Sequence, residues 1–383
     1  MMPGVPAADR LTLAFIADPN SIHNHRWLGW FARRGHEVYL LDGFDTEVQP
    51  GLDPRIQVVR YQMAARSRLP LMSTLRTRRN VRAQLLQLQP DVVHAQFLRR
   101  YGWQSAITGF HPRVISVWGS DVLRRSRTTW RQRAWDQFAL RTADMVTAVS
   151  PILRQAAIHA GADPRRVEIV QHGVDTEQFA PGPVDNELLA SHGLLDRRIV
   201  FSSRAIRPLY RHDTVIAAFA QLPPDAALVM SARGADQQYL GMLKEQMREL
   251  GVSERVLILD DIQEKDVLRF LHCAAVVVSL PESDSFPLTL LEAMACAVPV
   301  VATALPAARD VLGAIDPECL APVGDAQAAA IALRRALELT PTERQRLGQV
   351  LREYVVTNAD YETNMARMEG LYRQLAGSRA RRR

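Results

Sequence analysis

Cysteine is scarce and long apolar runs are absent from this sequence of 383 residues. The three cysteines, Cys273, Cys296 and Cys319, fall late in the chain without CxxC spacing, which argues against a disulfide framework and against a zinc site. No stretch approaches the roughly 20 apolar residues needed to cross a bilayer, and Met1 to Arg10 lacks the basic start and apolar run of a signal peptide. These absences predict a cytoplasmic protein.

Lysine is missing from the first 180 residues, which hold 24 arginines against 15 acidic residues, a balance of +9. The remainder has 23 basic and 26 acidic residues, a balance of −3. Such asymmetry can mark a face that meets an anionic membrane surface on the inner side, although arginines scattered over solvated faces would give the same count. We expect no nucleic-acid partner. The densest arginine cluster is Arg66, Arg68, Arg76, Arg78, Arg79 and Arg82.

Short apolar, β-branched runs alternate with amphipathic segments of helical period along most of the chain. This alternation is typical of parallel α/β layers. In the first half the expected strands are Leu11–Ala17, Val38–Leu41, Val92–Ala95, Val114–Val117, Met145–Ala148 and Val167–Val170. In the second half they are Ile199–Ser202, Ala227–Met230, Val256–Leu259, Ala275–Ser279 and Val298–Val301. The chain exceeds what one hydrophobic core usually supports, so we predict two doubly wound, Rossmann-like domains.

The boundary between the two domains is expected near Phe179-Ala180-Pro181-Gly182-Pro183, which continues neither a helix nor a central strand. We predict an N-terminal domain over 1–178, a linker over 179–196 and a C-terminal domain over 197–356. Residues 357–383 are expected to form a helix that returns to the N-terminal domain, followed by a basic tail. Open α/β sheets bind ligands at the carboxyl ends of their strands, so two such domains facing each other would enclose a cleft.

The segment from Asp284 to Glu292 directly follows an expected strand and is the most informative part of the sequence. Ser285 can cap a helix with Pro287 in its first turn, which would leave unpaired amides directed at an anionic or hydroxyl-rich ligand. Glu292 would lie on the flank of this helix, where a carboxylate can accept hydrogen bonds from two adjacent hydroxyls, as on a ribose. Two acids eight positions apart prove nothing by themselves.

The same segment resembles the retaining enzymes of glycosyltransferase family 4, which have the GT-B fold and are also known as group 1. Their pattern E-G-F-P-x-x-x-L-E-A-M-A, continuing G-x-P-V-V-A-T, appears here as Asp284 to Ala295 and Ala297 to Thr303. The resemblance implies that Glu292 holds the donor ribose and that Asp284 touches the transferred sugar. Asp284 is one methylene shorter than the usual Glu, and Glu282 is an alternative for this acid. The backbone expected to line the sugar and phosphate comprises Ser285, Phe286, Pro287, Leu288 and Thr289.

Two arginines match a second element of the family, an Arg after a strand followed by a Lys. Arg204 follows the strand Ile199–Ser202, and Arg211 stands near the Lys position. The resemblance implies that both hold the donor diphosphate, so that its charge is stabilised without a metal or other cofactor. Gly234, after the strand ending at Met230, is expected to form a backbone turn beside the nucleotide.

The N-terminal half departs from the family in one place. The usual H-G-x-D is replaced by Trp118-Gly119-Ser120-Asp121, so the imidazole near the transferred sugar is missing. Trp118 either stacks on a sugar or belongs to the core. Ser120 and Asp121 keep the family's positions, and we expect Ser120 on the acceptor side and Asp121 among the catalytic residues. His23 and Arg26 either reach the acceptor or are exposed neighbours of a helix capped by Ser21. Further matches are Gly35–Val38, Pro90–His94, Gly173–Phe179 and Gly324-Asp325.

The resemblance therefore predicts a retaining, metal-independent hexosyltransferase acting on a UDP- or GDP-sugar. A saccharide or lipid-linked acceptor, in cell-surface glycan synthesis, fits the basic N-terminal half. Two alternatives stay open: a nucleotide-sugar epimerase of the same fold, and a non-catalytic subunit that binds nucleotide sugars. A dinucleotide dehydrogenase is disfavoured because no expected strand is followed by GxGxxG.

Overall fold

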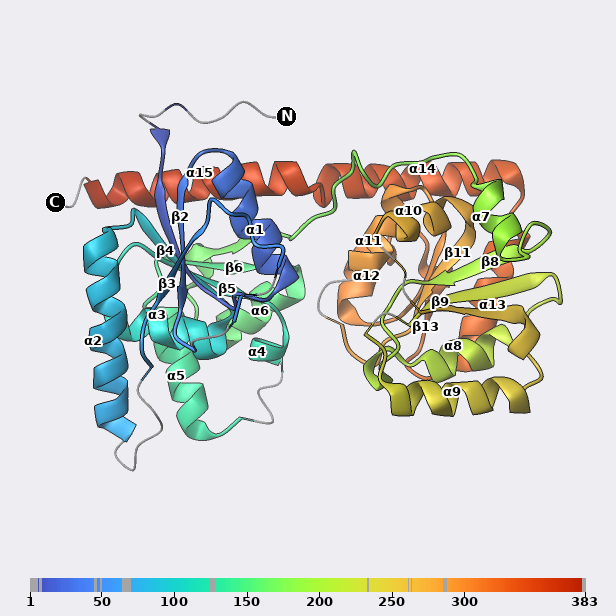
Figure 1. Ribbon diagram of the computed structural model, residues 1–383, viewed down its shortest axis with the longest axis horizontal. Coiled ribbons are helices and arrows are strands. Elements are labelled where there is room, and N and C mark those ends of the chain that lie inside the picture. Colours follow the sequence, from blue (N-terminus) through green and yellow to red (C-terminus); the bar gives the residue numbers. More distant parts are fainter. Residues whose placement is uncertain are drawn as a thin grey trace. The chain divides into compact units, whose positions relative to one another are not determined.

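The computed structural model shows a chain made of two α/β units (Figure 1). Contacts group residues 1–172 with 362–383 in an N-terminal unit, and residues 173–361 in a C-terminal unit. Each unit is described by itself. The structure describes residue 6 and residues 9–44, 47–48, 50–63, 70–123, 128–232, 234–260, 262, 264–284 and 288–380.

The N-terminal unit contains a seven-stranded parallel sheet of order β3-β2-β1-β4-β5-β6-β7. The chain runs outward from β1 to β3 and then crosses back to β4, so the strand order reverses between β1 and β4. The strands are β1 Thr12–Ile16, β2 Glu37–Asp42, β3 Gln57–Arg60, β4 Val92–Gln96, β5 Arg113–Val117, β6 Met145–Ala148 and β7 Val167–Ile169. Its helices are α1 Ile22–Arg33, α2 Pro70–Leu88, α3 Trp103–Thr108, α4 Ser120–Leu123, α5 Trp130–Arg141, α6 Pro151–Ala160 and α15 Tyr361–Ala380, with short turns at Leu98–Gly102 and Pro164–Arg166.

The last helix, α15, belongs to the N-terminal unit although it comes at the end of the sequence. Its Tyr372 is fully buried and its hydroxyl bonds with the imidazole of His94 on β4. Its Glu369 accepts a hydrogen bond from His36 Nε2 at 2.9 Å, while Nδ1 of the same ring accepts from the Leu11 amide at 3.0 Å. The start of β1 and the end of the chain are thereby joined in one buried polar network.

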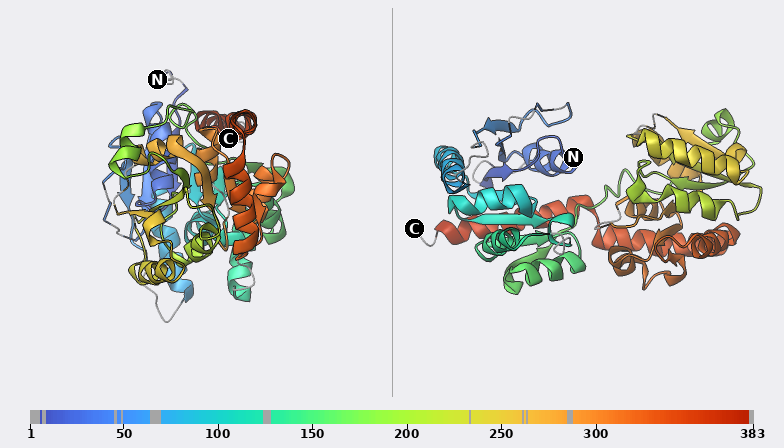
Figure 2. Two further views of the ribbon diagram at one scale, coloured as in Figure 1. Left: turned by 90° about the vertical axis from the view of Figure 1, so that its right-hand side faces the viewer. Right: turned by 90° about the horizontal axis from the view of Figure 1, so that it is seen from below.

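The C-terminal unit contains a six-stranded parallel sheet of order β10-β9-β8-β11-β12-β13. Here the order reverses between β8 and β11, and helices lie on both sides of the sheet (Figure 2). The strands are β8 Arg198–Ser202, β9 Ala226–Ser231, β10 Val256–Leu259, β11 Ala274–Ser279, β12 Val300–Thr303 and β13 Leu320–Ala321. The helices are α7 Asn186–Ser191, α8 His212–Phe219, α9 Gln237–Glu249, α10 Glu264–Cys273, α11 Leu288–Ala295, α12 Pro306–Leu312, α13 Ala326–Glu338 and α14 Pro341–Asn358, with short turns at Pro208–Tyr210, Ser253–Arg255 and Pro317–Cys319.

The predicted fold class, two Rossmann-like α/β domains, is confirmed. All eleven expected strands form with ends within two residues of the prediction. Helix α14 begins with a capping box formed by Thr340 and Glu343. Residues 179–196, expected as a linker, are partly built into the C-terminal unit, because Phe179, Leu188 and Leu194 are buried in its core. The contacts place the division between the units at His172 and Gly173.

Candidate functional site

The reversal of strand order in the C-terminal sheet brings together two residues that sequence reasoning had selected. Arg204 follows β8 and Asp284 follows β11, and these two strands are neighbours. The Arg204 guanidinium forms an ion pair with the Asp284 carboxylate and also donates from Nε to Ser279 Oγ at 3.4 Å. It lies over the ring of Tyr210, 4.8 Å from the centroid. Three contacts of different kinds thus fix its direction at the position where open α/β sheets bind ligands.

Arg211 lies at the start of α8 in the left-handed backbone region, with φ 48° and ψ 48°. Its guanidinium donates to both carboxylate oxygens of Asp213, from Nε at 3.1 and 3.2 Å and from Nη2 at 3.0 Å. Tyr239 on α9 donates its hydroxyl to the same carboxylate at 2.7 Å. Burial alone would raise the pKa of Asp213, but these two hydrogen bonds lower it, and the pKa of Arg211 is raised in turn. The pair is therefore fully ionised near neutral pH.

The acids of the Asp284 to Glu292 segment differ in their surroundings. Glu282 is exposed, and its negative charge contributes to the raised pKa of Arg211. Asp284 is half-buried and lines a small pocket together with Ser279 and Thr303. Glu292 is half-buried on α11. The geometry therefore gives Asp284 and Glu282 different arginine neighbours, Arg204 and Arg211.

The remaining residues expected to line the donor fall at the start of α11. Ser285, Phe286 and Pro287 lie outside the described residues. Leu288 is the first residue of α11, and Thr289 follows it. The hydroxyl of Thr289 is buried and has no hydrogen-bond partner within the described part of the chain. A buried hydroxyl of this kind favours an additional polar partner.

Two glycines in the left-handed region lie beside arginines, Gly234 beside Arg207 and Gly324 beside Arg211 of the site. Gly234 has φ +67°, and its carbonyl accepts from Arg207 Nε at 3.3 Å. Gly324 has φ +75°, and a Cβ there would lie 3.8 Å from the Arg211 guanidinium. Glycine adopts this backbone conformation at little cost, so both turns can approach the arginines closely. The expected turn at Gly234 is present.

In the N-terminal unit, Trp118 and His23 belong to one aromatic cluster near the carboxyl ends of the strands. The Trp118 ring meets those of His23 and His172 edge to face, with centroids 5.7 and 4.9 Å apart. Its Nε1 donates to Gln96 Oε1 at 3.2 Å. Burial lowers the pKa of His172 to about 3, with smaller contributions from His23 and Arg26. The pKa of His23 is also lowered, by burial and then by Arg26. Both imidazoles are therefore neutral near pH 7.

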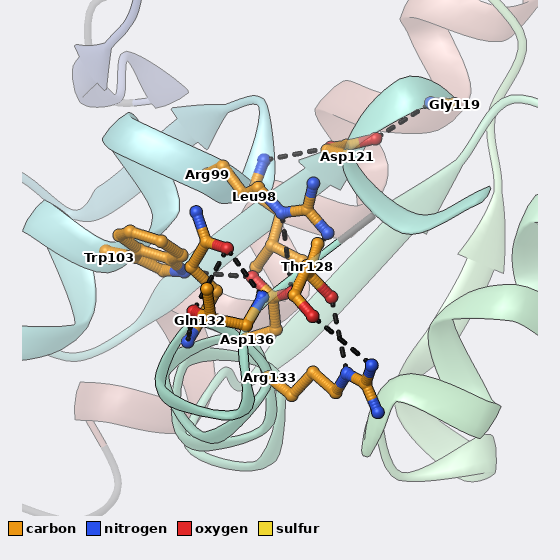
Figure 3. A network of polar contacts seen from close by, with 10 residues as sticks. Leu98, Arg99, Trp103, Gly119, Asp121, Thr128, Gln132, Arg133 and Asp136 are labelled. Atoms are coloured by element: carbon orange, nitrogen blue, oxygen red, sulfur yellow. Dashed lines mark hydrogen bonds and ion pairs between the residues drawn. The ribbon is translucent and has the colours of Figure 1, made fainter. Parts of the chain in front are cut away.

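Asp121, expected among the catalytic residues, comes three positions after Trp118 and is completely buried. It accepts hydrogen bonds from the backbone N–H groups of Leu98 at 3.0 Å and Gly119 at 2.8 Å (Figure 3). It also accepts from the backbone N–H of Trp118 at 3.2 Å. Burial raises its pKa, and the backbone hydrogen bonds oppose that rise. These contacts support a positioning role, in which Asp121 shapes the turn that presents Trp118. Ser120 is exposed at the start of α4, and Arg26 is half-buried on α1.

Several residues of the site were missed from the sequence. His172 completes the aromatic cluster, while Asp213 and Tyr239 hold Arg211. The spacing Arg211-His212-Asp213 carried a usable signal, because a base and an acid two positions apart at a helix start can pair. His172 and Tyr239 carried none, since their contacts depend on the packing of distant elements.

Among the described residues, no group of three or more His, Cys, Asp or Glu side chains is arranged to hold a metal ion. Within the same residues, every helix is too short or too polar to cross a bilayer.

Two family descriptions match successive halves of the chain. Residues 21–178 match "Glycosyltransferase Family 4", and residues 185–353 match "Glycosyl transferases group 1". Among curated proteins, the D-inositol 3-phosphate glycosyltransferase of Mycobacterium tuberculosis (strain ATCC 25177 / H37Ra) is 36% identical over 156 residues. That match covers 40% of this chain and 32% of the relative. The chain thus matches about a third of the length of such curated relatives.

Solved structures share the fold over nearly the whole chain. The Anabaena protein HepE, in complex with UDP and glucose, has a TM-score of 0.78 at 20% identity and covers 96% of this chain and 100% of its own. A glycosyltransferase from Rickettsia africae has a TM-score of 0.81 at 15% identity and covers 95% of this chain and 98% of its own. At these identities the likeness concerns the fold.

Proposed function

We propose that this chain, a GT-B protein with a group 1 glycosyltransferase domain, transfers a hexosyl group from a UDP- or GDP-sugar to a saccharide or lipid-linked acceptor. The observation that carries the proposal is the pairing of Arg204 with Asp284 at the reversal of strand order, close in sequence to Arg211. One acid for the sugar and two cations for the diphosphate then come from one edge of one sheet.

The predicted enzyme class, a glycosyltransferase, agrees with both matched domains. The donor rests on further support: HepE was solved with UDP and glucose, and a curated relative is named for a glycosyl transfer. We extend only the donor class to this chain, and the acceptor is proposed from the basic charge of the N-terminal half.

The transfer is proposed to retain the anomeric configuration. The acceptor hydroxyl oxygen attacks the anomeric carbon from the face on which the diphosphate leaves. The bond between the anomeric carbon and the diphosphate oxygen breaks, and its electron pair passes to the diphosphate. The leaving diphosphate then takes the proton of the acceptor hydroxyl. Arg204 and Arg211 stabilise the growing negative charge, because oriented guanidinium groups act strongly where little water competes. In this scheme fixed cations do the work for which a metal ion would otherwise serve.

Glu292 and Asp284 have separate roles in this proposal. Glu292 accepts hydrogen bonds from the two ribose hydroxyls of the donor and contributes mainly to binding. Asp284 contacts the sugar and keeps Arg204 directed at the diphosphate. On the acceptor side we propose contacts from His23, Arg26, Trp118 and Ser120.

The proposal is tested by a thermal-shift screen of nucleotide diphosphates and nucleotide sugars, followed by transfer assays. A ligand that binds the folded chain raises its melting temperature, so stabilisation by a UDP or GDP compound identifies the donor class. Glu292→Ala is expected to abolish transfer while the circular dichroism spectrum stays unchanged. Near-normal turnover by this variant would disprove the ribose assignment.

The two alternative functions give different results in the same assays. An epimerase would convert the nucleotide sugar to an isomer without any acceptor. A non-catalytic subunit, suggested by Trp118 in place of His, would show the thermal shift but no product with any acceptor. A product that forms only when an acceptor is present, without any isomerised nucleotide sugar, excludes both alternatives.

A further inference from the structure

Helix α5 of the N-terminal unit exposes large aromatic side chains that the proposed chemistry does not use. Trp130 is 72% exposed, Phe138 is 44% exposed and Trp135 is 36% exposed. Burying a side chain of this size removes a large apolar area from water, which is favourable. Several exposed rings on one surface therefore indicate an interaction site, whereas a single exposed ring does not. The three rings therefore require a partner or an environment that covers them.

The aromatic residues lie on one face of the helix. Trp130, Ala134 and Phe138 are spaced by four positions, and Arg131, Trp135 and Phe138 are spaced by four and three. The shallow groove on this face is lined by Trp130, Arg131, Ala134, Trp135 and Phe138, all from α5 itself. A groove formed by one helix is open to its surroundings. This open shape suits contact with an extended surface better than enclosure of a small molecule.

The exposed charged side chains of α5 are all positive. The only acidic residue of the helix, Asp136, is 1% exposed. It is neutralised from within the unit by Arg99 Nη2 at 3.3 Å and accepts from Trp103 Nε1 at 3.1 Å (Figure 3). The remaining charged side chains, Arg131, Arg133 and Arg141, are exposed. Among the residues of α5 itself, the exposed charges that flank the aromatic face are therefore all positive.

The start of α5 is held rigidly, so the aromatic face has a fixed direction. Thr129 and Gln132 form a capping box, in which the Gln132 side chain accepts from the Thr129 amide at 2.9 Å and the Thr129 hydroxyl accepts from the Gln132 amide at 3.3 Å. The guanidinium of Arg133 donates to the Thr128 carbonyl at 3.2 Å (Figure 3). Because the helix is already ordered, covering its aromatic face costs little conformational entropy.

Helix α2 adds basic and apolar side chains at the same end of the unit. Both helices begin on the side away from α15 (Figures 1 and 2). In its first turns α2 exposes Met72, at 63%, and Leu75, at 51%. Exposed arginines follow along the same helix: Arg76, Arg78, Arg79 and Arg82. Apolar side chains accompanied by arginines therefore occur on two helices of one unit.

We propose that the α5 face, formed by Trp130, Arg131, Trp135 and Phe138, docks the N-terminal unit on an anionic phospholipid bilayer. The rings would enter the interfacial region, where Trp is favoured, while the arginines contact lipid phosphates. A carbohydrate ligand fits less well, because the hydrogen-bonding groups of the groove, the Arg131 guanidinium and the indole N–H groups of Trp130 and Trp135, are all donors, so none accepts from a sugar hydroxyl. A second copy of the chain fits less well because equal positive charges would face each other. This proposal does not depend on the transfer reaction.

The test is co-sedimentation of the whole chain with vesicles of phosphatidylcholine containing phosphatidylglycerol, compared with vesicles of phosphatidylcholine alone. The double variant Trp130→Ser/Trp135→Ser is expected to bind the anionic vesicles at least about tenfold more weakly. Arg131→Gln is expected to weaken binding about fivefold, and added salt should weaken binding by the unchanged chain. Met242→Ser/Ile331→Ser, which removes two residues of the C-terminal unit exposed at 63% and 62%, is the matched control.

Equal vesicle binding by the double variant and the control would overturn the proposal, as would absence of binding by the unchanged chain. Trp130→Ser alone guards against a folding defect, because Trp130 is the most exposed of the rings, and its circular dichroism spectrum must match that of the unchanged chain. Light scattering without vesicles distinguishes another occupant: self-association lost in the double variant would assign the face to a second copy and overturn the membrane assignment. Vesicle binding is measured without substrates, so failed transfer leaves this result unaffected.

Discussion

Arg204 and Asp284, 80 positions apart in the sequence, form an ion pair at the edge of the C-terminal sheet where the strand order reverses. Both side chains are largely shielded from solvent, with exposed fractions of 14% and 17%. An arginine held in this way has a fixed direction. A diphosphate that binds Arg204 would share this guanidinium with Asp284 or replace the carboxylate.

Arg204→Gln is expected to lower kcat/KM for transfer by roughly 100- to 1,000-fold, the usual effect of removing one oriented group that stabilises developing charge. Arg211→Gln is expected to have a smaller effect, because the Arg211 side chain is 33% exposed against 14% for Arg204, so water weakens its interaction with the diphosphate more. Initial rates at several donor concentrations measure both. Arg248→Gln, which removes an exposed arginine paired with Glu245 on α9, is the control and should leave the rates unchanged. An effect of Arg211→Gln that exceeds that of Arg204→Gln would contradict this ranking.

The two candidate acids are separated by a matched pair of substitutions. Asp284→Asn is expected to lower kcat strongly, since it removes the charge that directs Arg204 as well as the proposed contact with the sugar. Glu282→Gln is expected to change kcat less than about threefold, because Glu282 is exposed and any interaction with Arg211 is screened by solvent. Steady-state kinetics with the same donor and acceptor compare them. The reverse order would assign the functional acid to Glu282.

The fold was accessible from the sequence because its central strands are buried on both faces. Such strands are rich in apolar residues, and Val92–Gln96 and Arg113–Val117, each with three apolar residues of five, are buried at every position. The two missed strands lie at sheet edges. Gln57–Arg60 has polar, exposed ends and only two apolar positions, and Leu320–Ala321 is two residues long. Neither sequence pattern can be distinguished from that of a loop.

The site was accessible only where it lies in contiguous sequence. Asp284 and Glu292 belong to one segment, and Arg204 follows one strand, so residue order was informative. The clustering of Trp118 with His23 and His172 joins three elements, and no local pattern encodes it. Asp121 illustrates the limit in another way. Its position in the Trp118-Gly119-Ser120-Asp121 motif was evident, but its complete burial beneath backbone amides follows only from the packing of Leu98 and its neighbours.

Asp121→Asn is expected to destabilise the N-terminal unit by about 1–3 kcal/mol. The carboxylate accepts three backbone N–H groups, whereas an amide offers one oxygen and directs N–H donors at others. Urea unfolding followed by tryptophan fluorescence measures the loss, and the thermal shift caused by a nucleotide should persist. Asp9→Asn, an exposed carboxylate of the same unit, is the control and should unfold like the unchanged chain. If the Asp121→Asn variant is as stable as the unchanged chain, the positioning role assigned to Asp121 is wrong.

Acid is expected to destabilise the N-terminal unit through its buried imidazoles. Burial lowers the pKa of His94 from 6.5 to about 3, so in the folded state this ring stays neutral while the unfolded chain takes up a proton. The stability is therefore fully present above the unfolded value and is lost as the pH falls from about 6.5 toward about 3. At about pH 5 the loss from His94 alone is about 2 kcal/mol.

His94→Gln removes this titrating group while a side chain able to bond with Ser116 and Tyr372 stays in place. The variant is expected to be less stable at about pH 7.5, because the ring also fills space beside Phe15 and Trp27. Its free energy of unfolding should nevertheless change less between about pH 7.5 and about pH 5, by about 2 kcal/mol. Urea titrations at both pH values measure the difference, and His159→Gln, an exposed position on α6, serves as the control. An equal pH dependence in both variants would show that His94 takes up its proton in the folded state as readily as in the unfolded chain.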